Sequence, residues 1–361
     1  MFSKNRFLAL LTATVSLAWL IGFSVTDAQQ KTPNPAVKAP APTVSPTVRP
    51  TPEDDVIRVE SDVVNVLFTA QDKNRRLLTD LKQGDIQLLE DGKAQDLVAF
   101  SRQVDLPLSL AILIDVSASQ ERTLPEEKAA AISFLETVIR PAKDEVCVVS
   151  FTGEATLEQG MTNNLPRLRR AVSSVRFAPP SGYLGGGVST GTPPISGRGA
   201  DVQGSTAIWD AIWVTSDEIL GPAPERTRRA IILITDGVNT YGKKKLDDAV
   251  QAALRSEAII YSVGIGDNFY SGVDRGSLNK VSERTGGRAY FPRDERELRE
   301  AFDQIQEEMR SQYLIAYEPS NQARDGSYRK IEIQLANAQM QKDKVKVTHR
   351  QGYFAKTSQK K

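Results

Sequence analysis

Short apolar runs alternate with amphipathic stretches along residues 106–311, and this pattern predicts strands alternating with helices. The run Leu110–Ile114 is apolar throughout and too short for an independent helix, as expected of a strand buried on both faces of a parallel sheet. The region therefore has the signature of an open α/β sheet. We expect further strands at 145–151, 155–161 (an antiparallel edge), within 229–237, at 258–264 and at 288–291, and helices at 126–140, 165–175, 243–256, 278–284 and 295–309.

The flanks of this region instead predict short strands, and in the N-terminal flank the apolar and polar positions alternate, with turn residues between the strands. The N-terminal flank, 56–104, contains a hairpin signal in Glu90-Asp91-Gly92-Lys93. This flank is too small to form a stable hydrophobic core by itself. The C-terminal flank, 312–356, offers the missing strands, so we expect one β-sandwich made from both flanks, with the α/β domain (106–311) inserted between them. The expected strands are 63–70, 86–92, 97–100, 313–317, 328–335 and 345–348.

Polar side chains follow the central apolar run at alternate positions. Asp115, Ser117 and Ser119 leave one side of a roughly extended chain and can converge beyond the strand end. One carboxylate and two hydroxyls form a hard-oxygen set, which suits Mg2+ better than Zn2+. The alternative is structural: Ser117 and Ser119 would cap the next helix.

The Asp-x-Ser-x-Ser pattern after a first strand resembles the von Willebrand factor A family, in which it opens a metal-ion-dependent adhesion site. Two later segments, Gly204–Ala211 and Arg229–Gly237, resemble the family's Thr-bearing loop and its Asp-ending strand. The resemblance implies a Rossmann-like domain with helices on both faces of a mostly parallel sheet, and a Mg2+ site, with Mn2+ and Ca2+ also open. The ligands that it implies are Asp115, Ser117, Ser119, Thr206 and Asp236.

The layout of residues 56–356 also resembles a bacterial group of exported proteins that carry a domain related to this family. The resemblance includes Leu89–Lys93 before the metal motif and Arg350–Phe354 after it. Residues 1–28 read as a secretory signal, or alternatively as an uncleaved N-terminal anchor. Residues 29–55 form a Pro-rich linker and 357–361 a short tail. We therefore expect export to the periplasm, the cell envelope or the medium.

The net charge and the small numbers of cysteine and histidine residues argue against several classes of function. The 361-residue chain has a formal net charge of +1, which gives no electrostatic reason to expect nucleic acid. Its single cysteine, Cys147, lies in a predicted buried strand and is expected to be an inert core thiol. Its only histidine, His349, is expected at the surface on a late strand without a catalytic role.

A long Gly- and Pro-rich segment, 176–204, leads to the expected ligand Thr206. It is either a specificity loop or an insertion without a role. We place Gly185, Gly186 and Gly187 on an expected partner-binding rim, together with Asp210. Asp210 follows Thr206 by four residues and could instead support the metal site or serve as a surface or capping residue.

These expectations favour an exported binding module over an enzyme. In the resembled family, an acidic residue of a protein partner completes the coordination of the ion. A metal-dependent hydrolase is the weaker alternative, because the motif lacks the second Asp, two residues on, that serves as acid and base in aspartyl-phosphate phosphatases. A metal-independent envelope scaffold is the other alternative, and it would leave the intact set of ligands without a purpose.

Overall fold

The computed structural model describes residues 63–102, 106–178, 205–224, 227–266 and 272–357. All of these residues belong to one unit of the chain, 59–361. The expected signal and linker, and the glycines at 185–187, lie outside the described residues. Among the helices in the described ranges, none is both long enough and apolar enough to cross a membrane.

A six-stranded sheet forms the centre of the α/β domain, in the order β10-β9-β8-β5-β6-β7. All neighbouring strands are parallel except β6 and β7, so the antiparallel edge expected at 155–161 is confirmed. Every residue of β5 is buried, as the unbroken apolar run predicted. The strands are β5 (Leu108–Asp115), β6 (Glu145–Phe151), β7 (Ala155–Thr162), β8 (Arg228–Thr235), β9 (Ala258–Gly264) and β10 (Ala289–Tyr290).

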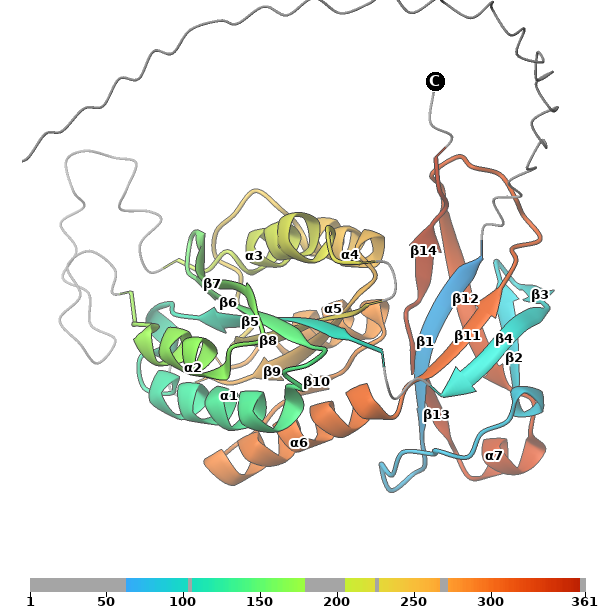
Figure 1. Cartoon of the computed structure of the whole chain (residues 1–361), viewed down its shortest axis with the longest axis horizontal. Coiled ribbons are helices and arrows are strands. Elements are labelled where there is room, and N and C mark those ends of the chain that lie inside the picture. Colours follow the sequence, from blue (N-terminus) through green and yellow to red (C-terminus); the bar gives the residue numbers. More distant parts are fainter. Residues whose placement is uncertain (1–62, 103–105, 179–204, 225–226, 267–271, 358–361) are drawn as a thin grey trace, which may run out of the picture. The chain divides into compact units, whose positions relative to one another are not determined.

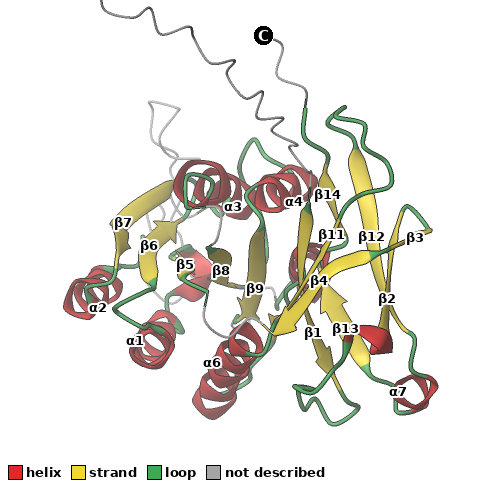
Figure 2. Ribbon diagram, turned by 45° about the vertical axis from the view of Figure 1, so that its right-hand side comes forward, coloured by secondary structure: helices red, strands yellow, loops and turns green. Residues whose placement is uncertain are grey.

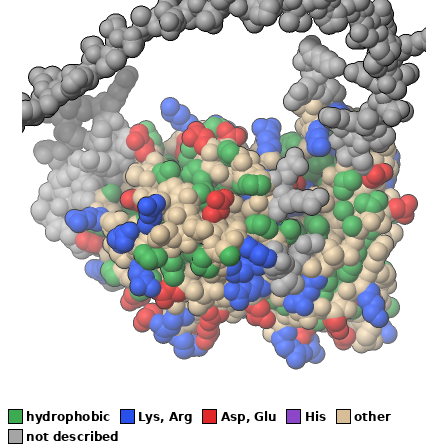
Figure 3. All heavy atoms as spheres, in the orientation of Figure 1, with side chains coloured by type: hydrophobic (Ala, Val, Ile, Leu, Met, Phe, Trp, Pro, Cys, Tyr) green, Lys and Arg blue, Asp and Glu red, His purple; other side chains and the backbone are tan. Residues whose placement is uncertain are grey.

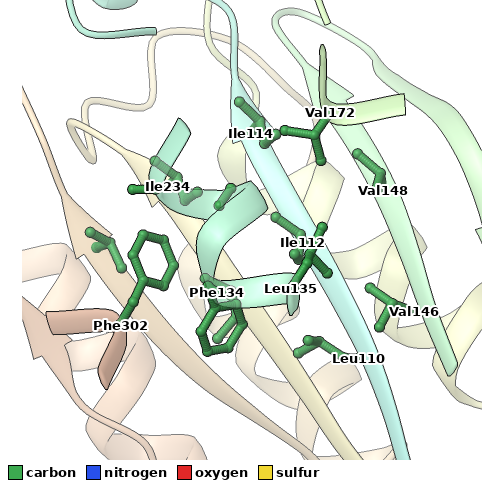
Figure 4. Close-up of a cluster of buried hydrophobic side chains, with 14 of the residues drawn as sticks. Leu110, Ile112, Ile114, Phe134, Leu135, Val146, Val148, Val172, Ile234 and Phe302 are labelled. Atoms are coloured by element: carbon green, nitrogen blue, oxygen red, sulfur yellow. The ribbon is translucent and has the colours of Figure 1, made fainter. Parts of the chain in front are cut away.

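Helices cover both faces of this sheet (Figure 1). One face packs against α1 (Leu124–Val138), α2 (Leu165–Ser174) and α6 (Glu295–Arg310). The other packs against α3 (Ile208–Val214), α4 (Leu246–Arg255) and α5 (Arg275–Thr285). Alternate side chains of β5 enter the two cores. Figure 4 shows the first core, where Ile114 lies beside Val172 and Ile112 beside Leu135. The rings of Phe134 and Phe302 pack against each other, with 5.0 Å between their centroids.

The two flanks form two four-stranded antiparallel sheets, in the orders β13-β1-β11-β4 and β14-β12-β2-β3 (Figure 2). Each sheet contains strands from both flanks, and their facing side chains share one apolar core that includes Phe68, Leu88 and Ile315. The single β-sandwich is therefore confirmed. Its strands are β1 (Val64–Gln71), β2 (Ile86–Glu90), β3 (Lys93–Gln95), β4 (Leu97–Arg102), β11 (Tyr313–Tyr317), β12 (Tyr328–Leu335), β13 (Lys346–His349) and β14 (Gly352–Phe354).

The hairpin between β2 and β3 turns at the predicted place. Asp91 and Gly92 both have positive φ, 48° and 80°, as a two-residue turn of the I′ type requires. The turn ends β2 at Glu90, a residue that is only 3% exposed. Its carboxylate accepts hydrogen bonds from Tyr317 (2.7 Å) and Tyr353 (2.9 Å), and the Arg329 guanidinium lies 3.5 Å away. The segments Leu89–Lys93 and Arg350–Phe354, one from each flank, are thus in contact inside the sandwich through Glu90 and Tyr353.

Some elements differ from the sequence expectations. The structure adds strand β14, a short helix α7 (Ala338–Lys342), single 3-10 turns η1 (Gln83–Asp85) and η2 (Ala118–Gln120), and a π-helical segment η3 (Thr215–Leu220). His349 does lie on β13, but the expectation of a surface residue is wrong. Its Nδ1 lies 2.7 Å from the Arg350 carbonyl oxygen, and its Nε2 accepts from the Ile333 amide at 3.2 Å. Burial lowers the pKa of His349, which makes it a neutral structural residue.

Cys147 lies in β6 and is fully buried, as expected. Burial raises the pKa of its thiol to about 12, so the thiol stays protonated at neutral pH. Basic and acidic side chains are interspersed over the face shown in Figure 3, in keeping with the formal net charge of +1.

Candidate metal site at the carboxyl edge of the central sheet

Asp115 ends β5 at the carboxyl edge of the sheet, and its side chain is fully buried. The chain turns back immediately, because the Ser117 amide donates to Asp115 Oδ1 at 2.9 Å. Asp115 Oδ2 accepts from the hydroxyl of Thr235 at 2.5 Å. Thr235 is the last residue of β8, which pairs directly with β5, so the hydrogen bond follows from the strand register. One carboxylate is thereby oriented by two neighbouring segments.

The two serines lie together on the turn that follows. Ser117 Oγ and Ser119 Oγ are 3.2 Å apart, and Ser117 is buried while Ser119 is partly exposed. The 3-10 turn that carries Ser119 is held by Gln120, whose buried amide donates to the Ile265 carbonyl at 3.2 Å. Because Ile265 directly follows β9, this hydrogen bond ties the turn to the same edge of the sheet.

Asp236 directly follows β8 and is only 2% exposed. Its Oδ1 accepts from the Val238 amide at 2.9 Å, which folds the next residues into a turn. Burial raises the pKa of Asp236, and hydrogen bonds from Ser119 and Gln120 oppose that rise. Asp236 is thus linked to the turn that bears the two serines.

Thr206 reaches this edge from the loop before α3. Its amide donates to the Thr240 hydroxyl at 2.8 Å, and its carbonyl accepts from the amides of Thr240 and Tyr241. The next residue, Ala207, donates to the Thr152 carbonyl just after β6. Since β5 lies between β6 and β8, these contacts carry the Thr206 loop across the end of β5, where Asp115 lies.

The two carboxyls make the site electrostatically unfavourable without a cation. Burial raises the pKa of Asp115 to about 7, and the neighbouring Asp236 charge adds to the rise. Neither carboxyl forms an ion pair with a Lys, Arg or His side chain in the described ranges. Two buried like charges without a basic partner are stabilised by a divalent ion. The donor set of carboxylate and hydroxyl oxygens fits a hard cation such as Mg2+.

Glu127 is a further acidic group near this site that the sequence did not reveal. It lies on α1 and is fully buried. Within the described residues, neither of its carboxyl oxygens has a hydrogen-bond partner. Burial raises its pKa to about 8, and the charges of Asp115 and Asp236 contribute to the rise. Burial therefore favours the protonated form of Glu127, which reduces the negative charge beside the two aspartates. In the described residues, no cluster of three or more His, Cys, Asp or Glu has metal-binding geometry, so any ion here depends on the hydroxyls too.

Asp210 is placed by the structure against the loop that follows Asp236. Its carboxylate accepts from the amides of Lys243 (3.1 Å) and Lys244 (3.0 Å), just before α4. A side chain added at Gly242 would meet Asp210 Oδ2 at 2.2 Å, so only glycine allows this approach. These contacts give Asp210 a capping and loop-fixing position, one of the alternatives open from the sequence.

An Asp210→Ala variant is expected to lower the free energy of unfolding by about 2 kcal/mol, because two backbone amides lose their acceptor. Loosening of the loop is expected to weaken Mg2+ binding by about tenfold. Urea unfolding and calorimetric titration measure the two effects. Asp217→Ala, which removes an exposed carboxylate from the adjacent π-helical segment, is the matched control. A variant that loses partner binding while keeping full stability would instead assign Asp210 to the partner-binding rim.

Three comparisons relate the chain to known proteins. The family model for the von Willebrand factor type A domain matches residues 200–304, which include Thr206 and Asp236 but not the segment around Asp115. A search of the curated proteins found no match. Several solved structures are similar to the chain at low sequence identity.

Proximal thread matrix protein 1 from the mussel byssus is 15% identical, with a TM-score of 0.46 over 61% of this chain. The chain spans about half the length of that mussel protein, 51%. Conserved hypothetical protein BatB from Bacteroides thetaiotaomicron is 17% identical, with a TM-score of 0.42 over 56% of this chain and 98% of that one. An aerotolerance-related membrane protein from Bacteroides fragilis is also 17% identical, with a TM-score of 0.41 over 56% of this chain and 100% of that one. Residues 200–304 are thus similar to a von Willebrand factor type A domain, and they lie within the sheet and helices described above.

Proposed function

We propose that the protein is an exported, metal-dependent protein-binding module. The observation that carries the proposal is the pair of buried carboxyls, Asp115 and Asp236, at the carboxyl edge of the sheet without a basic partner in the described residues. Ligands of open α/β sheets bind at this edge. The proposed ligands of the ion are Asp115, Ser117, Ser119, Thr206 and Asp236.

When bound, the ion supplies an electrophilic coordination position that an oxygen ligand from outside can fill. Only two of the five proposed ligands carry a negative charge, so a divalent ion keeps attraction for a further carboxylate. A Glu or Asp side chain of a protein partner has the right chemistry. The residues of this chain hold the geometry: Thr235 orients the Asp115 carboxylate, and Gln120 holds the turn that bears the serines.

Export is proposed from the sequence of the N-terminal segment alone. A charged start, a long apolar stretch and a Pro-rich segment at 29–55 suit delivery across a membrane and a spacer before the folded unit. Mg2+ is the proposed ion. Zn2+ needs a separate arm in any test, because one of the similar structures, of the mussel protein, is described with a zinc-occupied MIDAS motif.

A pull-down tests the proposed function. The chain from residue 53 onward is immobilised and exposed to an envelope extract of the source cells, in Mg2+, in Zn2+, and in EDTA. We expect at least one protein to be retained in Mg2+ and released by EDTA. An Asp115→Asn variant, which keeps the size of the side chain, is expected to retain none of it. Retention that is indifferent to both changes would support the metal-independent scaffold instead.

The stabilisation by Mg2+ is expected to depend on pH. The folded-state pKa of Asp115, about 7, lies above its ordinary value, so the metal-free protein holds an extra proton between about pH 4 and pH 7. Its stability therefore falls as pH rises through that window. Mg2+ binds the deprotonated form, so its stabilising effect is expected to be larger at about pH 8 than at about pH 5, reaching ~2–3 kcal/mol when Mg2+ is ~100-fold above its Kd.

Thermal unfolding with and without Mg2+ at the two pH values measures this effect. The Asp115→Asn variant is the control, because it has no ionisable group at that position. An equal or larger gain at the lower pH would contradict the assignment of the ion to these carboxyls.

A further inference from the structure

A cavity of about 420 Å3 lies at the opposite end of the central sheet from the metal site. It is lined by the first residues of β8, the end of α4 and start of β9, and residues of the sandwich strands β1 and β11. A volume of this size is typical of sites for small organic molecules. Since β8 separates Arg229 from Asp236 by seven residues, the cavity and the metal site are on the order of 20 Å apart.

Three arginines line the cavity, and all are more than nine-tenths buried. Arg228 and Arg229 are 7% exposed and Arg350 is 8% exposed. Backbone carbonyl oxygens accept hydrogen bonds from the terminal nitrogens of each arginine. Arg228 donates to Met309 and Leu106. Arg229 donates to Ala223 and Pro224, and Arg350 donates to Asn65. The protein thus fixes the orientation of these guanidinium groups.

Each of these arginines keeps one nitrogen without a partner. The Nε atoms of Arg228, Arg229 and Arg350 are buried and have no hydrogen-bond acceptor in the part of the chain that the structure describes. An unsatisfied buried donor is costly, and a charged one more so. Because these Nε atoms have almost no accessible surface, an anion in the cavity would be attracted by the charge of the guanidinium groups and not by hydrogen bonds from Nε.

The charges of the lining residues are unbalanced. Among the described residues that line the cavity, Glu257 is the only acidic one, against the three arginines. It lies 3.2 Å from Arg350 and 3.8 Å from Arg229, and its own side chain is 48% exposed. A partly exposed carboxylate screens these buried cations incompletely, so the described part of the lining has an excess of positive charge. Arginine favours carboxylate and phosphate groups, which it can bind with two parallel hydrogen bonds.

The rest of the lining is largely apolar and includes Leu67, Leu254, Ile259 and Leu314. Such walls favour an aliphatic body next to the charged group and disfavour a fully hydrated ion. We propose that this cavity binds an aliphatic carboxylate, with its carboxylate at Arg229 and Arg350, the two arginines that share Glu257, and its chain against these aliphatic side chains. The site is independent of the proposed metal-dependent binding.

Octanoate is the probe for this proposal, measured by calorimetric titration of the purified full chain. Acetate tests the charge alone, octanol tests the chain alone, and inorganic phosphate tests an anion of the other class. We expect saturable binding of octanoate and at least tenfold weaker binding of the other three. Acetate or phosphate binding as tight as octanoate, or octanol binding as tight, would overturn the proposal.

Two variants locate the binding. Arg229→Met is expected to weaken octanoate binding at least tenfold. Glu257→Gln removes the competing internal carboxylate and is expected to tighten binding severalfold, a gain that misfolding cannot mimic. The matched control is Arg255→Met, which removes an exposed arginine of α4 that packs over Phe354 and does not line the cavity. Octanoate affinity that is unchanged in both cavity variants would exclude this site.

Discussion

Replacing Asp115 with Asn is expected to weaken Mg2+ binding by at least about 100-fold. The substitution removes one of the two charged oxygen donors of the proposed site and leaves the size of the side chain unchanged. The side-chain carbonyl of the introduced asparagine can still accept from the Ser117 amide, so the turn that bears the serines is expected to persist. Calorimetric titration with Mg2+ measures the affinity, and the same titration of the unchanged protein gives the reference.

The metal-free stability of this variant separates lost binding from lost folding. In the metal-free protein, burial and the nearby Asp236 raise the pKa of Asp115 to about 7, so its charge opposes folding at higher pH. Asparagine carries no charge. The metal-free variant is therefore expected to unfold at a higher urea concentration than the unchanged protein at about pH 8. A variant that binds Mg2+ normally would contradict the assigned ligand set.

Replacing Glu90 with Ala is expected to lower the free energy of unfolding by about 3–5 kcal/mol. The change leaves the Arg329 guanidinium buried, at 3% exposed, without its carboxylate. It also removes the acceptor of the Tyr317 and Tyr353 hydroxyls. Urea unfolding followed by circular dichroism measures the loss.

The matched control is Glu332→Ala. Glu332 lies on β12, the strand that carries Arg329, but its side chain is 47% exposed and its contact with Lys330 is 3.7 Å long. Exposed ion pairs contribute little, so this control is expected to cost less than about 1 kcal/mol. If the Glu90 and Glu332 variants were equally stable, the buried network would not hold the two flanks together.

The strand and helix pattern of the α/β domain could be predicted because it depends on local periodicity. An apolar run ending in Asp115 identifies a buried strand and its carboxyl end together, and the alternation of Ser117 and Ser119 is visible in the sequence. The segments β14, α7 and the π-helical turn η3 were not predicted. They are three to six residues long, which is too short for a periodic signal.

The supporting residues of the site could not be predicted, because they depend on strand register and tertiary packing. Thr235 meets Asp115 only because β8 and β5 are neighbours paired in register. Glu127 reads in the sequence as one of several charged residues at a helix start, and its burial near the two aspartates appears only in the fold. The arginines around the cavity likewise come from segments far apart in the sequence, around Arg229 and Arg350.

The positions of the glycines at 185–187 lie outside the described residues, so their place on a partner-binding rim stays a prediction. The metal ligands stay a proposal in the same sense. The donors around Asp115 and Asp236 fit a hard divalent ion by their chemistry and their buried charge.

The most direct measurement is the position of a bound Mn2+ ion, found by anomalous scattering from crystals soaked in Mn2+ as a substitute for Mg2+. We expect one strong peak at the carboxyl edge of the central sheet, within about 2.1–2.3 Å of its direct ligands or one water molecule further away. Those ligands are expected to come from Asp115, Ser117, Ser119, Thr206 and Asp236. A crystal that binds Mn2+ elsewhere, with no peak between Asp115 and Asp236, would contradict the proposed metal site.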